Sequence, residues 1–444
     1  MHALLTIAYA CLFSVIIYRN AFFRLSEINR FWIPVIFWLK IGAGILLWAV
    51  YNYHYSFRSD TFIYFDDAMV IRNLWSEDRE AFWKFLFGVG TDQPDMAYVH
   101  DRLRTWTKSY SYGLSYDGPT IVRFNLLISL FSGGYYHVHT VFMCFLSLIG
   151  LTGLFRAFSK IFLGREWMLF VACFMIPSVV FWSSGVLKEA PLIMALGILV
   201  YSIFGLLENH KRILYWVLLG CSLFILKFLK EYVIISMLPA LLSLLVYRLI
   251  GRRRVLSVFL SVHVICFVIS MNASSFFVGG NFLYVLNKKQ TDFYNVTNLV
   301  EAKSGIDRID ISDYTHFFMG YPKALGNTYL RPHILEMKTV FYWPVAIENL
   351  LFFVLIVVTL FRFRRPDRAL LPALLFAFSF VVILGGIVGF TVPILGALIR
   401  YKIVALPFLA VCCFALIRPF SIPTFLWQSS DSKKQAEQLH PEAK

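Results

Sequence analysis

The feature that most restricts the fold of this chain is a series of long apolar stretches with almost no charge. Residues 31–51 contain one charged side chain, Lys40, and residues 232–249 contain one, Arg248. A helix of about 20 apolar residues is long enough to cross a bilayer. Of the 444 residues, 59% are hydrophobic and 15% are charged, whereas soluble proteins carry about 25% charged residues. The sequence therefore excludes a soluble fold and predicts an all-α, polytopic membrane protein.

Eleven transmembrane helices are predicted from the hydropathy pattern. They are placed at residues 2–17, 31–51, 135–154, 167–182, 189–206, 213–227, 232–249, 255–273, 345–361, 369–390 and 401–417. Together they predict one transmembrane domain, residues 1–417, with two long loops at 52–134 and 274–344. The polar remainder, 418–444, is predicted to be a disordered tail.

The distribution of basic residues predicts the orientation of these spans. The connections at 18–30, 155–166, 207–212, 248–254 and 362–368 each carry two to four Lys or Arg. Basic loops of membrane proteins face the cytoplasm. The two long loops and the N-terminus are thus expected outside, and the C-terminal tail inside. This asymmetry accounts for the net charge of +15 without a nucleic-acid partner.

Several common enzyme signatures are missing from the sequence. It has no Walker A motif, no Gly-x-Gly-x-x-Gly fingerprint, no His-Glu-x-x-His and no Cys-x-x-Cys. All seven cysteines lie in predicted spans, so no disulfide framework is expected. His137 and His139 lack a third ligand at suitable spacing, so a zinc site is not expected. Any chemistry is therefore expected on the outer face.

The strongest local pattern is acidic and follows the second predicted span. On a helix, Asp60, Tyr64 and Asp67 would lie at positions i, i+4 and i+7, which share one face. These acids could be first-turn residues that favour a helix dipole, and that interpretation covers Asp66 well. Asp60 and Asp67 lie among aromatic residues, where desolvation raises a carboxyl pKa and suits a general base. Asp66 and Asp67 are also a candidate pair for a divalent cation beside a diphosphate.

A second set of candidates is cationic and lies near the predicted outer ends of the spans. Taken singly, each such cation is expected to snorkel to the membrane interface. Together they are unexpected, because the positive-inside rule predicts few Lys or Arg at this edge. Converging cations suit an anion such as a lipid-linked phosphate or diphosphate. With Tyr64, the candidate substrate-binding residues are Arg58, Arg123, Lys188, Glu189, Lys227, Lys230, Arg331, His333, Arg400 and Lys402.

Aromatic residues crowd the first long loop. They predict either a surface that holds sugar rings or an ordinary interfacial aromatic belt. These residues are Trp75, Trp83, Tyr98, Trp106, Tyr110, Tyr112 and Tyr116.

Four short segments resemble bacterial polytopic proteins of cell-surface polysaccharide assembly, the Wzy/EpsG-type polymerases and GT-C-like glycosyltransferases. The segments are RSDTFIYFDDA, PSVVFWSSGVLKE, GNTYLRP and GALIRYKIVALPFL. The resemblance implies a GT-C-like fold in the bacterial inner membrane, and inverting sugar transfer from an undecaprenyl-linked donor on the outer face. It also implies a catalytic aspartate among Asp60, Asp66 and Asp67, and functional arginines at Arg331 and Arg400.

The leading functional hypothesis is a membrane glycosyltransferase or polysaccharide polymerase with a polyprenyl-(di)phosphate-linked donor. Its expected partners are that donor, a glycan or lipid-linked acceptor, and other envelope-assembly proteins. One alternative is a lipid-linked oligosaccharide flippase or other transporter, which should carry charges deep in its spans. The sequence shows almost none there. A second alternative is a non-catalytic assembly subunit, which would leave the acidic pattern at Asp60 and Asp67 unexplained.

The predicted orientation can be tested with reporter fusions. A reporter fused after Arg254 should report a cytoplasmic position, and one inserted near Asp95 or Asp307 should report an external position. Because lipid-linked donors of this class are used on the outer face, a cytoplasmic position for both long loops would contradict the functional hypothesis.

Overall fold

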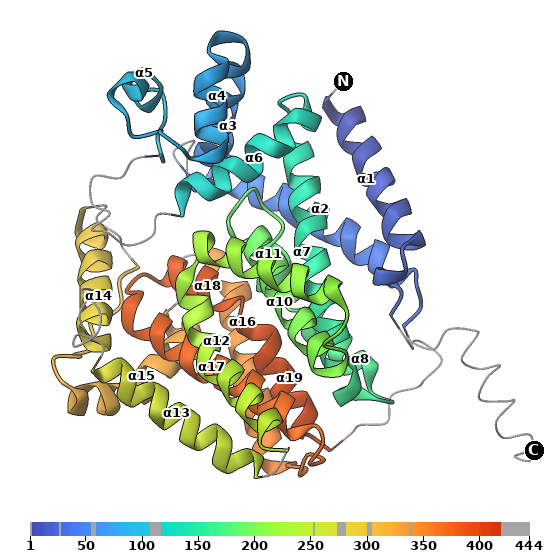
Figure 1. The fold of residues 1–444 in the computed structure, drawn as a ribbon, viewed down its shortest axis with the longest axis vertical. Coiled ribbons are helices and arrows are strands. Elements are labelled where there is room, and N and C mark those ends of the chain that lie inside the picture. The colour runs from blue at the N-terminus through green and yellow to red at the C-terminus, as the bar shows by residue number, and fades with distance from the viewer. Residues whose placement is uncertain are drawn as a thin grey trace, which may run out of the picture. The chain divides into compact units, whose positions relative to one another are not determined.

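The computed structural model describes residues 2–25, 28–54, 59–106, 117–251, 254–272, 281–299, 304–336 and 340–418. Within these ranges the regular secondary structure is helical, as Figure 1 shows, and β pairing is limited to two isolated bridges. The all-α prediction is confirmed. Arg58, three loop tyrosines (Tyr110, Tyr112 and Tyr116) and residues 419–444 of the predicted tail lie outside the described residues.

Seven of the described helices are long and apolar enough to cross a membrane. They are α1 (His2–Arg19), α2 (Trp32–Tyr53), α7 (Tyr136–Phe158), α10 (Glu189–Glu208), α12 (Glu231–Leu249), α16 (Trp343–Phe361) and α17 (Leu371–Thr391). An eighth span results if α18 (Leu395–Lys402) and α19 (Leu406–Leu416), which meet at a bend of 58°, are counted as one. The protein is therefore a multi-pass helical membrane protein.

The remaining apolar segments form shorter helices. The apolar helices α11 (Ile213–Leu229) and α13 (Val255–Met271) have 17 residues each. The expected span at 167–182 is instead two short helices, α8 (Glu166–Phe174) and α9 (Pro177–Trp182). Pro177 explains the break, because proline lacks the backbone N–H that a continuous helix needs and disfavours helical geometry in the preceding residue. The count of eleven spans stays a prediction.

Both long loops contain helices. The first holds α3 (Asp60–Glu77), α4 (Arg79–Phe87), α5 (Ala97–His100) and α6 (Gly118–Ser132), and the second holds α14 (Phe282–Leu299) and α15 (Tyr314–Leu330). Short 3-10 helices lie at Ala21–Phe23, Pro94–Met96, Ser159–Phe162, Ile334–Glu336 and Val340–Tyr342.

The chain separates into two compact units. Unit 1 contains Met1–Ala157 and Val180–Glu231, and unit 2 contains Phe158–Val179 and Tyr232–Ser421. In unit 1, α3 packs against α4 and α6, and α10 packs against α11. In unit 2, α17 packs against α15 and α19, and α8 packs against α19.

Glycines allow two helices of unit 1 to approach closely. A Cβ atom added to Gly197 of α10 would lie 1.9 Å from the carbonyl oxygen of Gly150 in α7. One added to Gly150 would lie 2.1 Å from the carbonyl oxygen of Ile193. Membrane helices associate through van der Waals packing, because the hydrophobic effect does not drive them together within lipid. Small residues at a crossing increase this packing by letting the backbones approach.

This contact predicts unequal effects of alanine at two helical glycines. Gly197→Ala should destabilise the protein by about 1–3 kcal/mol, because the backbones must move apart. Gly42→Ala in α2 has no atom within 4 Å of the new Cβ and should be neutral or up to about 1 kcal/mol stabilising. Thermal unfolding of the purified variants measures both. Equal melting temperatures would contradict the predicted close packing.

Candidate functional site

The acidic pattern of the first long loop forms one face of α3. The helix begins at Asp60, with Ser59 in an extended conformation before it. Tyr64 and Asp67 are 3% and 1% exposed and lie on the buried face, together with Ile71. The i, i+4, i+7 spacing therefore places Tyr64 and Asp67 inside the packed part of unit 1 rather than at its surface.

Asp67 holds a loop onto α3. Its carboxylate accepts hydrogen bonds from the backbone N–H of Arg104 (2.9 Å) and of Thr105 (2.8 Å), and from the Thr105 hydroxyl (2.5 Å). Hydrogen bonds to a carboxylate are stronger than those between neutral groups. With both oxygens engaged and 1% exposure, Asp67 is poorly placed to accept a proton from a substrate. This geometry favours a structural role over the predicted catalytic one.

Asp66 lies on the other side of α3. Its side chain is 53% exposed, and its carboxylate is 4.0 Å from the guanidinium of Arg104. Partial burial raises the pKa of Asp66, and the positive charge of Arg104 opposes this shift. Because Asp67 uses both oxygens elsewhere, the two carboxylates do not form a suitable pair for a divalent cation. Among the described residues, no group of three His, Cys, Asp or Glu could hold a metal ion.

A second carboxylate, Asp117, gathers two of the predicted cations. Its Oδ1 lies 2.7 Å from Lys188 Nζ, and its Oδ2 lies 2.7 Å from Lys230 Nζ. Burial alone would raise the pKa of Asp117, but the charges of Lys230 and Lys188 lower it below its usual value. Asp117 therefore stays ionised between two ammonium groups.

The two lysines connect Asp117 to the start of α3. The Lys188 ammonium lies over the ring of Tyr64, 4.9 Å from its centroid, a cation–π contact. Burial lowers the pKa of Lys188, while the charges of Asp117 and, more weakly, Asp60 raise it. Asp60 is half-buried. We refer to Asp60, Tyr64, Asp117, Lys188 and Lys230 as the acid–lysine cluster.

Sequence reasoning found four members of this cluster but not Asp117. A usable signal was present, because Asp117 precedes Gly118 and Pro119, and an acidic residue before a proline in the first turn is a standard helix start. Here the carboxylate makes no side-chain capping bond, since it binds the two lysines.

Two other predicted cations of unit 1, Arg123 and Lys227, make different contacts. Arg123 donates from Nε to the carbonyl oxygen of Phe85 (2.9 Å) and stacks on Trp106, with 4.8 Å from Cζ to the ring centroid. Arg123 therefore connects α6 to the end of α4 and to the segment that carries Trp106. Lys227 is 64% exposed and lies 3.6 Å from Glu231, as expected of an interfacial cation. Glu189 is buried at the start of α10.

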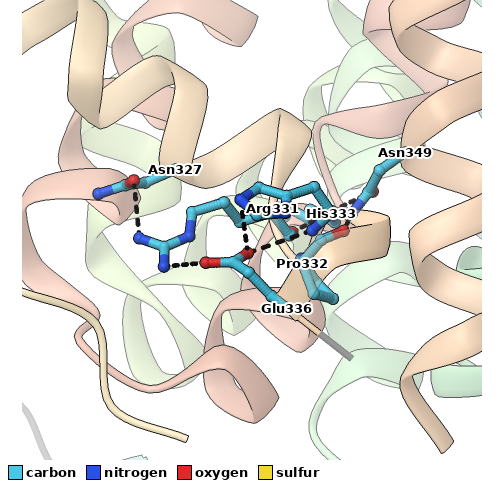
Figure 2. A network of polar contacts seen from close by, with 7 residues as sticks. Asn327, Arg331, Pro332, His333, Glu336 and Asn349 are labelled. Atoms are coloured by element: carbon cyan, nitrogen blue, oxygen red, sulfur yellow. Dashed lines mark hydrogen bonds and ion pairs between the residues drawn. The ribbon is translucent and has the colours of Figure 1, made fainter. Parts of the chain in front are cut away.

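Unit 2 brings Arg331 and Lys402 together, although not as a paired anion site. The guanidinium of Arg331 forms an ion pair with Glu336 and a weaker contact with Asn327 (3.4 Å), as Figure 2 shows. Lys402 is fully buried and donates to the carbonyl oxygen of Arg331 (3.2 Å) and to Asn349 Oδ1 (2.6 Å). Both cations therefore already have partners within the protein.

Other residues near the Arg331–Glu336 pair hold the end of the second loop in place. His333 is 53% exposed, and its backbone N–H donates to Glu336 (3.2 Å). Asn349 donates to the carbonyl oxygen of Pro332 (2.9 Å), which anchors the same segment to α16 (Figure 2). Arg400 is half-buried on α18. The predicted proximity of the last span to the segment entering α16 is thus present, through the contacts of Lys402 with the Arg331 carbonyl and the Asn349 side chain.

The structure also places charged groups deep in apolar helices. Lys40 in α2 is fully buried and donates to Ser183 Oγ at 2.6 Å. Glu348 in α16 accepts from the backbone N–H (2.7 Å) and the hydroxyl (2.6 Å) of Ser178. Hydropathy averages conceal such residues, because one charge in twenty apolar positions barely changes the mean.

Comparisons with protein-family models, curated proteins and solved structures gave no significant match to this chain. Its function is therefore inferred from its own residues.

The assignment of Asp67 predicts a stability defect. Asp67→Asn should destabilise the protein by about 1–3 kcal/mol, because an amide has no charge and one acceptor oxygen for three donors. Amide hydrogen exchange at Arg104 and Thr105 should become faster. The matched variant Asp66→Asn, at a half-exposed position, should leave both properties nearly unchanged. Identical exchange rates in the two variants would contradict the anchoring role.

Proposed function

We propose that this protein is a membrane glycosyltransferase or polysaccharide polymerase that acts on the outer face of a bacterial inner membrane. It transfers sugar from a polyprenyl-(di)phosphate-linked donor to a glycan or lipid-linked acceptor, in surface polysaccharide assembly. The observation that carries this proposal is the acid–lysine cluster, in which the half-buried Asp60 acts electrostatically on Lys188.

In the proposed reaction, the Asp60 carboxylate accepts the proton of an acceptor hydroxyl. The hydroxyl oxygen attacks the anomeric carbon of the donor and forms the new glycosidic bond. The bond between that carbon and the lipid phosphate oxygen breaks, and the electron pair leaves with the phosphate. Lys188 and Lys230 stabilise the departing negative charge.

The charge balance of the cluster supports this division of roles. With Asp60 ionised, the charges of Asp60, Asp117, Lys188 and Lys230 sum to zero; once Asp60 has accepted the proton of the acceptor, the cluster carries one net positive charge. A phosphate that leaves there meets a favourable field, while Asp60 supplies the base on the neighbouring helix. Among the remaining carboxylates of α3, Asp66 is the second candidate base, because its pKa is raised and its side chain is accessible.

A transporter of lipid-linked oligosaccharide is the second candidate function. The sequence indicated almost no charges deep in the spans, but Lys40 and Lys402 are both buried. This favours a transporter, since charged groups within spans often mark transport pathways. Their partners within each unit are protein groups, Ser183 for Lys40 and Asn349 for Lys402. Each lysine therefore connects two segments of its own unit, which is a structural role. For this reason we keep the transferase as the first proposal.

The base assignment predicts a selective loss of activity. Asp60→Asn should lower product formation by at least about 100-fold, because the amide keeps the size of the side chain but cannot take a proton. The control Asp101→Asn, at an exposed position of the same loop, should retain normal activity. Glycan product is measured in cells that lack the native gene, with protein level and melting temperature recorded for each variant.

The same experiment separates the two acids of α3. Loss of product in Asp66→Asn with normal product in Asp60→Asn would move the base to Asp66. Normal product in both variants would refute a carboxylate base on α3 and leave the transporter or the assembly subunit as the better account.

A further inference from the structure

The connection between α9 and α10, residues 183–188, is irregular in conformation and yet every residue in it is buried. Loops usually run over the surface, because buried irregular backbone leaves polar groups without partners. In a membrane protein such a segment is tolerated where the protein itself surrounds it. The contacts around this connection therefore determine where its last residue, Lys188, lies.

One face of α2 forms the surface on which this connection packs. The face contains Lys40, Gly44 and Leu47, which are spaced i, i+4 and i+7 and are all buried. A Cβ atom added to Gly44 would lie 2.5 Å from the carbonyl oxygen of Ser184, and one added to Gly185 would lie 2.8 Å from Leu47 Cδ2. The helix and the connection are therefore in close contact, with no space for a side chain at either glycine.

A charged group of α2 holds the start of this connection. Lys40 is 0% exposed, and its ammonium donates a hydrogen bond to Ser183 Oγ at 2.6 Å. Burying an ammonium costs free energy even when it is hydrogen-bonded, and an apolar side chain of similar volume is often as stabilising or more so. Helix packing alone therefore does not require a lysine here. What the lysine adds is a directional bond that fixes Ser183.

The end of the connection supplies a member of the acid–lysine cluster. Lys188 follows Ser183 by five residues, and its ammonium lies 2.7 Å from Asp117 Oδ1. Between them the N–H of Leu187 donates to the carbonyl oxygen of Gly185 at 2.8 Å, which keeps the connection tight. A displacement of about 1 Å at a reacting group can lower a rate about 100-fold. A shift of Ser183 would therefore affect the ammonium of Lys188.

We propose that Lys40 is a positioning residue for the acid–lysine cluster. Its hydrogen bond to Ser183 holds the buried connection so that Lys188 reaches Asp117 and the departing phosphate. The inference rests on the proposed function, because it assumes that Lys188 stabilises that phosphate. It adds to the site a residue of α2 that acts through the connection and not through contact with the substrate.

The first test measures turnover of polyprenyl-linked donor, extracted from cells that lack this protein, by the purified Lys40→Met variant. The value of kcat should fall about tenfold or more, because Lys188 is no longer held in place. The KM for the donor should change by less than about threefold, because the lost interaction acts mainly in the transition state. The melting temperature should be unchanged or higher, since methionine removes a buried charge.

The matched control is Lys211→Met, at an exposed lysine between α10 and α11, which should keep a normal kcat. A normal kcat in folded Lys40→Met would overturn the proposal. So would a loss of activity that disappears when the rate is expressed per folded molecule, because that result indicates a role in stability alone.

A double-mutant cycle tests whether Lys40 acts through Ser183. Ser183→Ala removes the acceptor and should lower kcat to a similar extent, and the double variant Lys40→Met with Ser183→Ala should be no slower than either single variant. Effects that multiply would show that Lys40 acts independently of Ser183, and would overturn the proposal. If Ser183→Ala leaves the ammonium unpaired and does not fold, the double variant, which also removes that ammonium, is compared with Lys40→Met alone.

A measurement without substrate separates this inference from the proposed function. Amide hydrogen exchange in a peptide that covers residues 183–188 should be about tenfold faster in Lys40→Met than in the wild-type protein, and unchanged in Lys211→Met. Equal exchange in Lys40→Met and wild type would overturn the positioning role, whatever the activity. Normal product in both Asp60→Asn and Asp66→Asn would instead refute the carboxylate base, and would leave the exchange result as it stands.

Discussion

The cost of removing charge from water governs the organisation of this protein. In a chain that is 59% hydrophobic, a buried ammonium or carboxylate must find hydrogen-bonding partners within the protein. Asp117 lies between two lysines, Lys402 binds Asn349 and a carbonyl oxygen, and Lys40 binds Ser183. Each of these contacts joins segments that are distant in sequence, so the buried charges help to fix how helices meet within a unit.

The cost of burying charge also distinguishes side chains with a structural role from those that remain available to a substrate. Asp67 and Arg123 form hydrogen bonds with backbone groups of the first long loop. The acid–lysine cluster differs, because its ammonium groups bind the Asp117 carboxylate and the nearby Asp60 is only half-buried. In the proposed reaction, the proton taken up by Asp60 leaves one net positive charge in the cluster, which favours an anionic leaving group.

Much of the fold followed from the sequence, because apolar runs of sufficient length specify membrane helices. The start of α3 at Asp60 and the joint face of Tyr64 and Asp67 also followed, since helical periodicity is a local property. The loop bond of Asp67 and the role of Asp117 could not be predicted, because their partners lie 37 to 113 positions away in the chain. The division of the 167–182 segment was foreseeable from Pro177, whereas hydropathy alone suggested a continuous span.

The proposed transferase must break the bond between a sugar and its lipid phosphate. The most direct test uses the purified protein reconstituted in liposomes, together with polyprenyl-linked donor extracted from cells that lack this protein. The lipid is followed by mass spectrometry. The account predicts release of free polyprenyl phosphate or diphosphate, together with a new glycosidic bond of inverted anomeric configuration. Donor that crosses the bilayer with its sugar still attached, and no released lipid phosphate, would contradict it.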